Sequence, residues 1–155
     1  MKMITIVAFS DSHGLPIPDR LLNVAKENDY VLFAGDGASS LGDLLLLKNL
    51  HIVRGNCDAC TFDDEEIIDV GSTRILLTHG HKYHVKRDLT ALSFRARELG
   101  CNLVVYGHTH FAQITQDADI TFVCPGSLLS PPSGVPSYAY IVIADGKITA
   151  KIVNL

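Results

Sequence analysis

Five short polar clusters, each with a glycine, hold the side chains of this sequence that are best suited to chemistry. They are Asp11-Ser12-His13-Gly14, Gly35-Asp36, Gly55-Asn56-Cys57-Asp58, His79-Gly80-His81 and Gly107-His108-Thr109-His110. Aspartate and asparagine offer oxygen ligands and histidine offers nitrogen, a mixture that suits Mn²⁺, Zn²⁺, Fe or Co²⁺ better than Ca²⁺ or a cysteine-type structural zinc. The candidate ligands are too many for one tetrahedral ion and suit two ions that share a bridging carboxylate. Two such ions would form a clamp for in-line displacement at phosphorus.

Each cluster follows an apolar segment that the residue pattern predicts to be a β-strand. These segments are Met3–Phe9, Tyr30–Ala34, His51–Arg54, Arg74–Thr78 and Leu103–Tyr106. The functional groups of an open α/β sheet collect outside the carboxyl ends of its strands. We therefore expect the five clusters to meet in space although they lie far apart in the sequence.

The remaining segments predict helices in the first half of the chain and mostly strands in the second. Pro16 and Pro18 begin a helix that runs to about Asn28, and a leucine-rich helix is expected over about Ser39–Asn49. Strands that alternate with helices predict right-handed crossovers and a parallel sheet. The other expected elements are a strand at Glu66–Val70 that forms a hairpin with Arg74–Thr78, a helix over Lys86–Leu99 closed by Gly100, and strands at Ala112–Thr115, Ile120–Cys124, Tyr138–Ala144 and Ile148–Val153. We expect an α/β fold in which two sheets pack face to face with helices outside, a four-layer αββα sandwich.

Length and composition limit the class of protein. The 155 residues suffice for a single domain, residues 1–155, with its own core. A hydrophobic share of 47% and a charged share of 19% exclude a disordered chain, and the net charge of −4 offers no field that attracts nucleic acid or an anionic membrane. No apolar run approaches the roughly 18–20 residues of a membrane span. The first strand lacks a signal-peptide cleavage site, and four cysteines are too few for a disulfide framework, so we predict a cytoplasmic protein.

The five clusters, taken in order, resemble the metal motifs of the calcineurin-like metallophosphoesterases. The short chain and the Gly-Asn-Cys-Asp form of the third cluster are most similar to the small bacterial and archaeal phosphodiesterase branch. The resemblance covers almost the whole chain, from residue 3 to about residue 145. It implies a metal-dependent phosphoesterase that acts on a small phosphoester substrate, with phosphodiesters preferred over monoesters.

The resemblance also implies two sets of metal ligands with one residue common to both. The first ion is held by Asp11, His13 and His110, the second by Asn56, His79 and His108, and both by Asp36. A hydroxide that bridges the ions would be the nucleophile. Two divalent ions are thus the expected cofactors, with manganese first and zinc, iron, nickel or cobalt as alternatives.

Position 57 departs from the pattern of many relatives, in which a histidine there helps to protonate the leaving group. Here the residue is Cys57, whose thiol is a poor substitute. His81 is the nearest alternative donor, and a metal-bound water is another. Asp58 is either a partner of a ligand histidine or part of a surface turn. We therefore take His81, Cys57 and Asp58 as candidate catalytic residues, and His81 and Phe111 as candidate substrate contacts, against the plainer reading of a solvated histidine and a packed phenylalanine.

Two further features have both a functional and an ordinary interpretation. Cys57 and Cys60 form a C-x-x-C pattern, but no second such pair completes a zinc site and no thioredoxin-like context surrounds it. A run of basic residues can steer phosphate or simply form a solvated helix face. The run consists of Lys82, Lys86, Arg87, Arg95 and Arg97.

Rival functions remain at this point. The metal-site residues can be read as ordinary loop residues that cap helices, although capping does not explain four histidines. The retromer subunit with this fold is a precedent for a protein-binding scaffold with a weak or silent metal site. A nuclease could use the same centre, but the acidic net charge does not favour nucleic acid as partner. A homodimer is left open.

Overall fold

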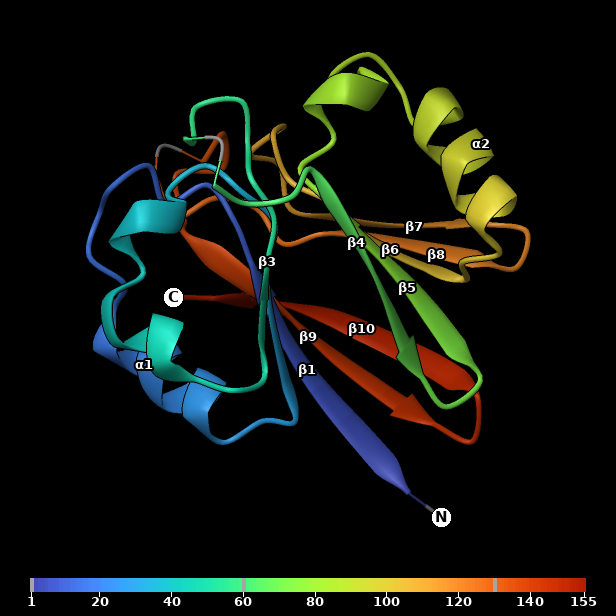
Figure 1. Cartoon of the computed structure of the whole chain (residues 1–155), viewed down its shortest axis with the longest axis horizontal. Coiled ribbons are helices and arrows are strands. Elements are labelled where there is room, and N and C mark those ends of the chain that lie inside the picture. Colours follow the sequence, from blue (N-terminus) through green and yellow to red (C-terminus); the bar gives the residue numbers. More distant parts are fainter. Residues whose placement is uncertain (1, 60, 130) are drawn as a thin grey trace.

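Two five-stranded sheets form the centre of the computed structural model, which describes residues 2–59, 61–129 and 131–155. The first sheet has the order β10-β9-β1-β2-β3 and the second β4-β5-β6-β8-β7. The strands are β1 Met3–Phe9, β2 Tyr30–Phe33, β3 Leu50–Ile52, β4 Glu65–Val70, β5 Thr73–Thr78, β6 Leu103–Val105, β7 Gln113–Asp117, β8 Ile120–Cys124, β9 Ser137–Ala144 and β10 Lys147–Asn154. The predicted α/β sandwich is confirmed (Figure 1).

Both sheets are mixed, with a parallel set of strands at their centre. In the first sheet β1, β2 and β3 run parallel, in the register Ile6↔Tyr30 between β1 and β2. In the second sheet β5, β6 and β8 run parallel. Antiparallel neighbours extend each set, and Asp145-Gly146 makes the tight turn between β9 and β10 with φ of 51° and 75°.

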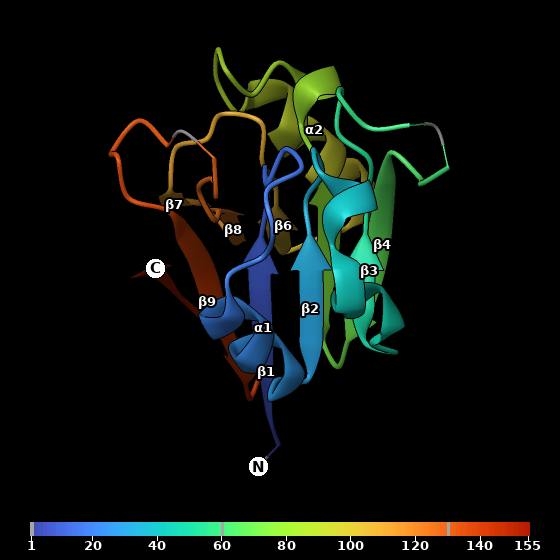
Figure 2. The ribbon, with the colours of Figure 1, turned by 90° about the vertical axis from the view of Figure 1, so that its left-hand side faces the viewer.

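The inner faces of the two sheets pack against each other, and one α-helix covers each outer face (Figures 1 and 2). Alternating residues such as Ile6 and Ala8 of β1 meet Ile75 and Leu77 of β5 in the inner core. Helix α1, Asp19–Lys26, packs on the first sheet, and helix α2, Thr90–Leu99, packs on the second. None of the helices formed by the described residues is long and apolar enough to cross a membrane.

The predicted leucine-rich helix over Ser39–Asn49 is wrong. The chain forms two short 3-10 helices instead, η1 at Ala38–Ser40 and η2 at Gly42–Leu46. Gly42 between them has a φ of 56°, which a right-handed helix does not contain, so one continuous α-helix cannot form. The leucines still serve the core, because Leu41 and Leu44 are buried against the first sheet.

Two predicted helices are shorter than expected. Helix α1 ends at Lys26 rather than Asn28, and α2 begins at Thr90 rather than Lys86. The turn before α2 follows a third 3-10 helix, η3 at His81–Tyr83, and His84 has a φ of 55° that interrupts any helix there. Gly100 closes α2 in the left-handed conformation as expected.

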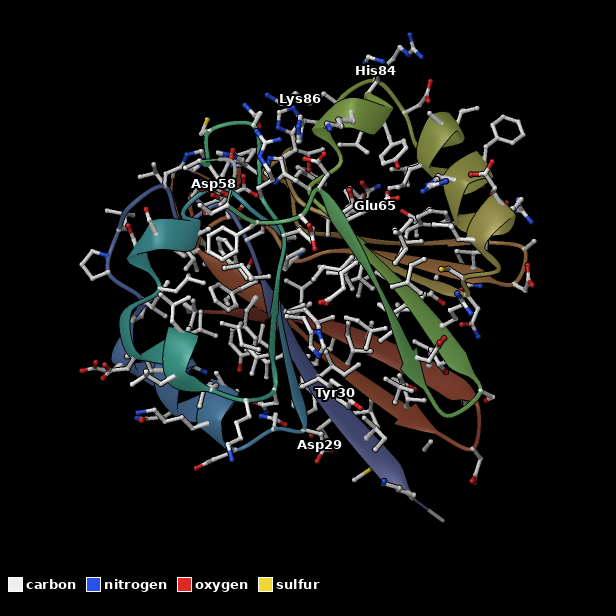
Figure 3. All side chains as sticks on the ribbon, in the orientation of Figure 1. Asp29, Tyr30, Asp58, Glu65, His84 and Lys86 are labelled. Carbon is white, nitrogen blue, oxygen red and sulfur yellow. The ribbon has the colours of Figure 1, made fainter. Side chains whose placement is uncertain are left out.

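The loops that follow β1, β2, β3, β5 and β6 gather at one end of the sandwich (Figure 2). Parallel strands place their carboxyl ends at the same edge of a sheet, and face-to-face packing brings the two edges together. In Figure 3 the labelled Asp58 lies at this end and the labelled Asp29 and Tyr30 lie at the other. The five polar clusters therefore share one end of the molecule.

Candidate metal centre

The backbone of the five loops is strained at the residues that bear the candidate ligands. Among the described residues, eight that are not glycine have a positive φ. Five of these belong to the predicted metal set: Asp11, His13, Asp36, His108 and His110. A left-handed conformation at a residue with a side chain costs on the order of 1 kcal/mol, and such residues persist where the surrounding structure enforces them. The strain thus marks this group of loops as a functional site.

One group of ligand atoms is formed by Asp11, His13 and His110. The Nε2 atoms of the two histidines lie 3.2 Å apart. Asp11 Oδ1 lies 3.6 Å from His13 Nε2 and 3.3 Å from His110 Nε2. Three donor atoms therefore converge on one point between the loops after β1 and β6.

A second group is formed by Asp36, His79 and His108, with Asn56 beside it. His79 Nε2 lies 3.3 Å from Asp36 Oδ2, 3.1 Å from Asn56 Oδ1 and 3.2 Å from His108 Nδ1. Four donor atoms from four different loops face one another here.

Asp36 stands between the two groups. Its Oδ2 atom lies 3.3 Å from His79 Nε2 in one group and 3.8 Å from His13 Nε2 in the other. Its Oδ1 atom accepts a hydrogen bond of 2.8 Å from the backbone N–H of Cys57, which fixes the orientation of the carboxylate. Asp36 is thus placed to serve both groups at once.

Both groups suit a cation, which no part of the described chain supplies. The Oδ1 atom of Asp11 is buried and has no hydrogen-bond donor among the described residues. Burying such an oxygen without a partner is costly. Metal bonds of about 2.0–2.2 Å put neighbouring ligand atoms roughly 2.8–3.6 Å apart, the range of most of the separations above. The donor set therefore fits divalent metal ions.

The hydrogen bonds of His79 direct a lone pair towards the centre. Its Nδ1 atom lies 2.7 Å from the carbonyl oxygen of Ala34, which can only accept, so Nδ1 carries the proton. Nε2 then presents its lone pair to Asp36, Asn56 and His108. A hydrogen-bonded outer nitrogen is typical of histidines that bind metals.

The electrostatics of the centre favour positive charge at its middle. Burial acts to lower the pKa of His79, but the hydrogen bond to Asp36 and the charges of Asp11 and Asp36 outweigh it and raise that pKa. Burial also acts to raise the pKa of Asp36, yet its contacts with His79 and Cys57 lower it. Burial raises the pKa of Asp11. A bound cation would supply the positive charge that these carboxylates stabilise at His79.

His108 is held neutral and so keeps a free lone pair. Burial, followed by the charges of His79, Lys86 and His81, lowers the pKa of His108 to about 4. A neutral imidazole is the form that binds a metal ion.

Asp58 lies beneath the centre rather than beside a ligand histidine. Its Oδ2 atom accepts hydrogen bonds from the backbone N–H groups of Asp36 at 2.7 Å and Gly55 at 2.8 Å. Its Oδ1 atom accepts from Gly37 at 2.8 Å and Ala38 at 3.1 Å. With four backbone donors, this carboxylate positions the loops that bear Asp36 and Asn56, and it offers no free group for proton transfer.

We predict that Asp58→Asn lowers the free energy of unfolding by about 2–4 kcal/mol, because an amide NH₂ would face two backbone N–H donors that now bond to an oxygen. Thermal and urea unfolding of the protein without metal measure this directly. Asp43→Asn, on an exposed residue of η2, is the matched control and should leave stability unchanged. Equal midpoints for the two variants would contradict the positioning role of Asp58.

The other candidate residues lie at different depths around the centre. The exposed Cys57 has its Sγ 3.5 Å from Asn56 Nδ2 and within reach of His13 and Asp36. The His81 ring lies 5.4 Å from that of His79, centroid to centroid. Phe111 follows His110 and is half exposed, and its backbone N–H donates to Thr109, so it stays a predicted substrate contact.

The two remaining sequence features are partly resolved. Cys60 lies outside the described residues, so the C-x-x-C pattern stays untested. Most of the basic run is occupied by acidic neighbours, as expected of a solvated helix face. Lys82 pairs with Asp64, Arg95 with Glu65 and Glu98, Arg97 with Asp117 and Arg87 with Asp88.

Two serines that sequence analysis did not identify hold Asp11. The hydroxyl of Ser10 donates to Asp11 Oδ2 at 2.6 Å, and that of Ser127 donates to the Asp11 carbonyl at 3.0 Å. Ser10 is adjacent to Asp11 and could have been suspected from its place at the end of β1. Ser127 lies 116 positions away, and nothing in the sequence connects the two residues.

Comparison with known proteins bears on the same residues. Residues 4–146 match the family model of the calcineurin-like phosphoesterase superfamily domain. "Probable metallophosphoesterase YsnB" of Bacillus subtilis is 32% identical over 154 residues, which cover 96% of this chain and 89% of that protein. A predicted phosphoesterase from Streptococcus pneumoniae superimposes with a TM-score of 0.84 at 28% identity and covers 99% of this chain and 91% of its own. A single mutant of Vps29 from Entamoeba histolytica has a TM-score of 0.77 at 24% identity, with 98% of this chain and 99% of its own covered, and shows the fold alone.

Proposed function

The chain belongs to the calcineurin-like phosphoesterase superfamily, and from that premise we propose that it is a phosphodiesterase with a dinuclear metal centre. Membership of this metal-dependent family makes phosphoester hydrolysis the general reaction. The observation that carries the finer proposal is the convergence of two donor groups on the carboxylate of Asp36.

We assign the two ions to the two donor groups. One would be held by Asp11, His13 and His110, the other by Asn56, His79 and His108, and both by Asp36. Such ions polarise phosphoryl oxygens and activate water near neutral pH. The mixture of carboxylate, amide and imidazole without a required thiolate supports manganese first, with zinc, iron, nickel or cobalt as alternatives.

The chain's own residues would bind the phosphate and supply a proton to the leaving oxygen. We assign that proton transfer to His81, because its ring borders the rings of both His79 and His108. Cys57 is the weaker candidate, since burial and the charge of Asp36 raise the pKa of its thiol. Phe111 is assigned to substrate contact from its half-exposed position after His110.

Hydrolysis of bis-p-nitrophenyl phosphate tests the proposal. Protein stripped with a chelator should be inactive, and added Mn²⁺ should restore turnover well above that of Mn²⁺ alone. No turnover above the metal blank would favour a protein-binding scaffold with a silent site. Metal-dependent cleavage of a short oligonucleotide, faster than that of the small diester, would favour a nuclease.

We predict that Cys57→His raises the rate on diesters with poor leaving groups by about 10-fold or more, because an imidazole at this position can protonate the leaving oxygen. The gain should be small with p-nitrophenolate, which needs no proton to leave. The measurement is kcat for a series of aryl methyl phosphates with leaving groups of increasing pKa, and Cys57→Ser is the control. An equal gain across the series, or none, would mean that another group already supplies the proton.

A further inference from the structure

A hollow of about 410 Å³ opens beside His81 at the edge of the proposed metal centre. Its other lining residues are Asp63, Asp64, Glu65, Thr78, Lys82 and Tyr83. The His81 ring that borders it lies 6.1 Å from the ring of His108, centroid to centroid. The Nδ1 atom of His81 is buried and has no hydrogen-bond partner among the described residues. The hollow is thus continuous with the reaction site and includes a polar group that lacks a partner there.

Two of the three carboxylates in this hollow are already neutralised. Asp64 bonds to Arg54 at 2.8 Å and to Lys82. Glu65 pairs with Arg95 and accepts a hydrogen bond of 2.6 Å from the hydroxyl of Tyr83. These pairs also attach η3, which carries His81, to the start of β4. They leave the walls polar and nearly uncharged.

Asp63 differs from its two neighbours. Its residue is exposed on the rim of the hollow, and no ion pair joins its carboxylate to any residue that the structure describes. The hollow therefore carries one negative charge that no cation of the described chain offsets. A ligand with a further negative charge would be repelled there, and a cation would be attracted.

A second, smaller hollow of about 260 Å³ lies on the opposite side of the donor groups, beside His13. Its walls include Ser39, Ser40 and Cys57. A phosphodiester has two alcohol substituents, and two hollows of unequal size beside one centre offer a place for each. A monoester would leave one of them without a ligand.

We propose that the hollow beside His81 receives the leaving alcohol of the substrate and selects an uncharged or cationic alcohol over an anionic one. This inference rests on the proposed function and extends it. In the reaction, the oxygen of water bonds to phosphorus and the bond between phosphorus and the alcohol oxygen breaks. The alcohol departs with a proton, so the products are that alcohol and a phosphomonoester. The substrate class is a diester of a hydroxyl- or amine-bearing alcohol, and not one whose leaving group carries further phosphates.

Three diesters that differ only in the charge of the leaving group provide the test. They are the methyl esters of 4-acetylphenyl, 4-carboxyphenyl and 4-trimethylammoniophenyl phosphate, neutral, anionic and cationic in the leaving group. The quantity compared is the ratio of kcat/KM in a variant to kcat/KM in the unaltered protein, measured for each ester with Mn²⁺ present. This ratio cancels differences in intrinsic reactivity among the esters.

Asp63→Asn should raise the ratio about threefold for the anionic ester, lower it about threefold for the cationic ester and leave the neutral ester unchanged. Asp63→Lys should enlarge both changes to about tenfold, and about 0.5 M salt should nearly abolish them. Asp145→Asn, in the β9–β10 turn at the other end of the molecule, is the matched control and should change none of the ratios.

Turnover of all three esters with ratios that do not depend on leaving-group charge in either Asp63 variant would overturn this inference alone. Lack of turnover of every ester by the unaltered protein would overturn the proposed function and the inference with it. A charge effect that appears only when the charge is moved to the other alcohol would assign the hollow to the departing phosphomonoester and refute the assignment made here.

Discussion

Asp36→Asn should abolish metal-dependent hydrolysis of bis-p-nitrophenyl phosphate, with a loss on the order of 10³-fold or more. The amide keeps one oxygen, which can still accept the hydrogen bond from Cys57, so the loop should remain in place. The other oxygen, which faces both His13 and His79, is replaced by a nitrogen that cannot bind a cation. Metal content by mass spectrometry should fall from two ions per chain to one or none.

The matched control for this variant is again Asp43→Asn, which removes the same charge at an exposed position. It should keep both the metal content and the rate of the unaltered protein. If Asp36→Asn retained two ions and a near-normal rate, the bridging role of Asp36 would be wrong. Circular dichroism of both variants should show an intact fold.

Gly55→Ala should remove metal binding without altering any ligand. A Cβ atom at residue 55 would lie 2.0 Å from Oδ1 and 2.6 Å from Cγ of Asp36, far inside van der Waals contact. The carboxylate cannot rotate freely away, because Cys57 holds its Oδ1 and Asp58 holds the backbone of Asp36. We expect a loss of activity of about 10²-fold or more together with a destabilisation of about 1–3 kcal/mol from overpacking. Metal titration, kcat/KM and thermal unfolding measure the three effects.

Gly71→Ala separates this steric effect from the general cost of replacing a glycine. Residue 71 lies in the turn between β4 and β5, has a φ of 59°, and a Cβ atom there would meet nothing within 4 Å. It should lose about 1 kcal/mol of stability through backbone strain and keep its metal ions and its rate. A Gly55→Ala protein with normal metal affinity would show that the Asp36 loop can shift, which would contradict the rigid placement described above.

Much of the fold could be predicted because its signals are local. Runs such as Met3–Phe9 are apolar throughout and rich in β-branched residues, so they are typical of strands buried on both faces. The prediction failed over Ser39–Asn49, where leucine content favours a helix but Gly42 adopts a left-handed φ. The start of α2 was also misplaced, because His84 adopts a left-handed conformation that its residue type does not announce.

For the centre, the sequence by itself determined which donor atoms exist and that each follows a strand, since residue type and periodicity are properties of the chain alone. Only the tertiary structure decided how they meet: that Asp36 faces both groups, that Asp58 binds four backbone N–H groups, and that Ser127 reaches Asp11. These contacts join residues on different loops, often from different sheets. Their distances depend on how the two sheets pack and on left-handed backbone at Asp11, Asp36 and His108, which no local pattern of residues encodes.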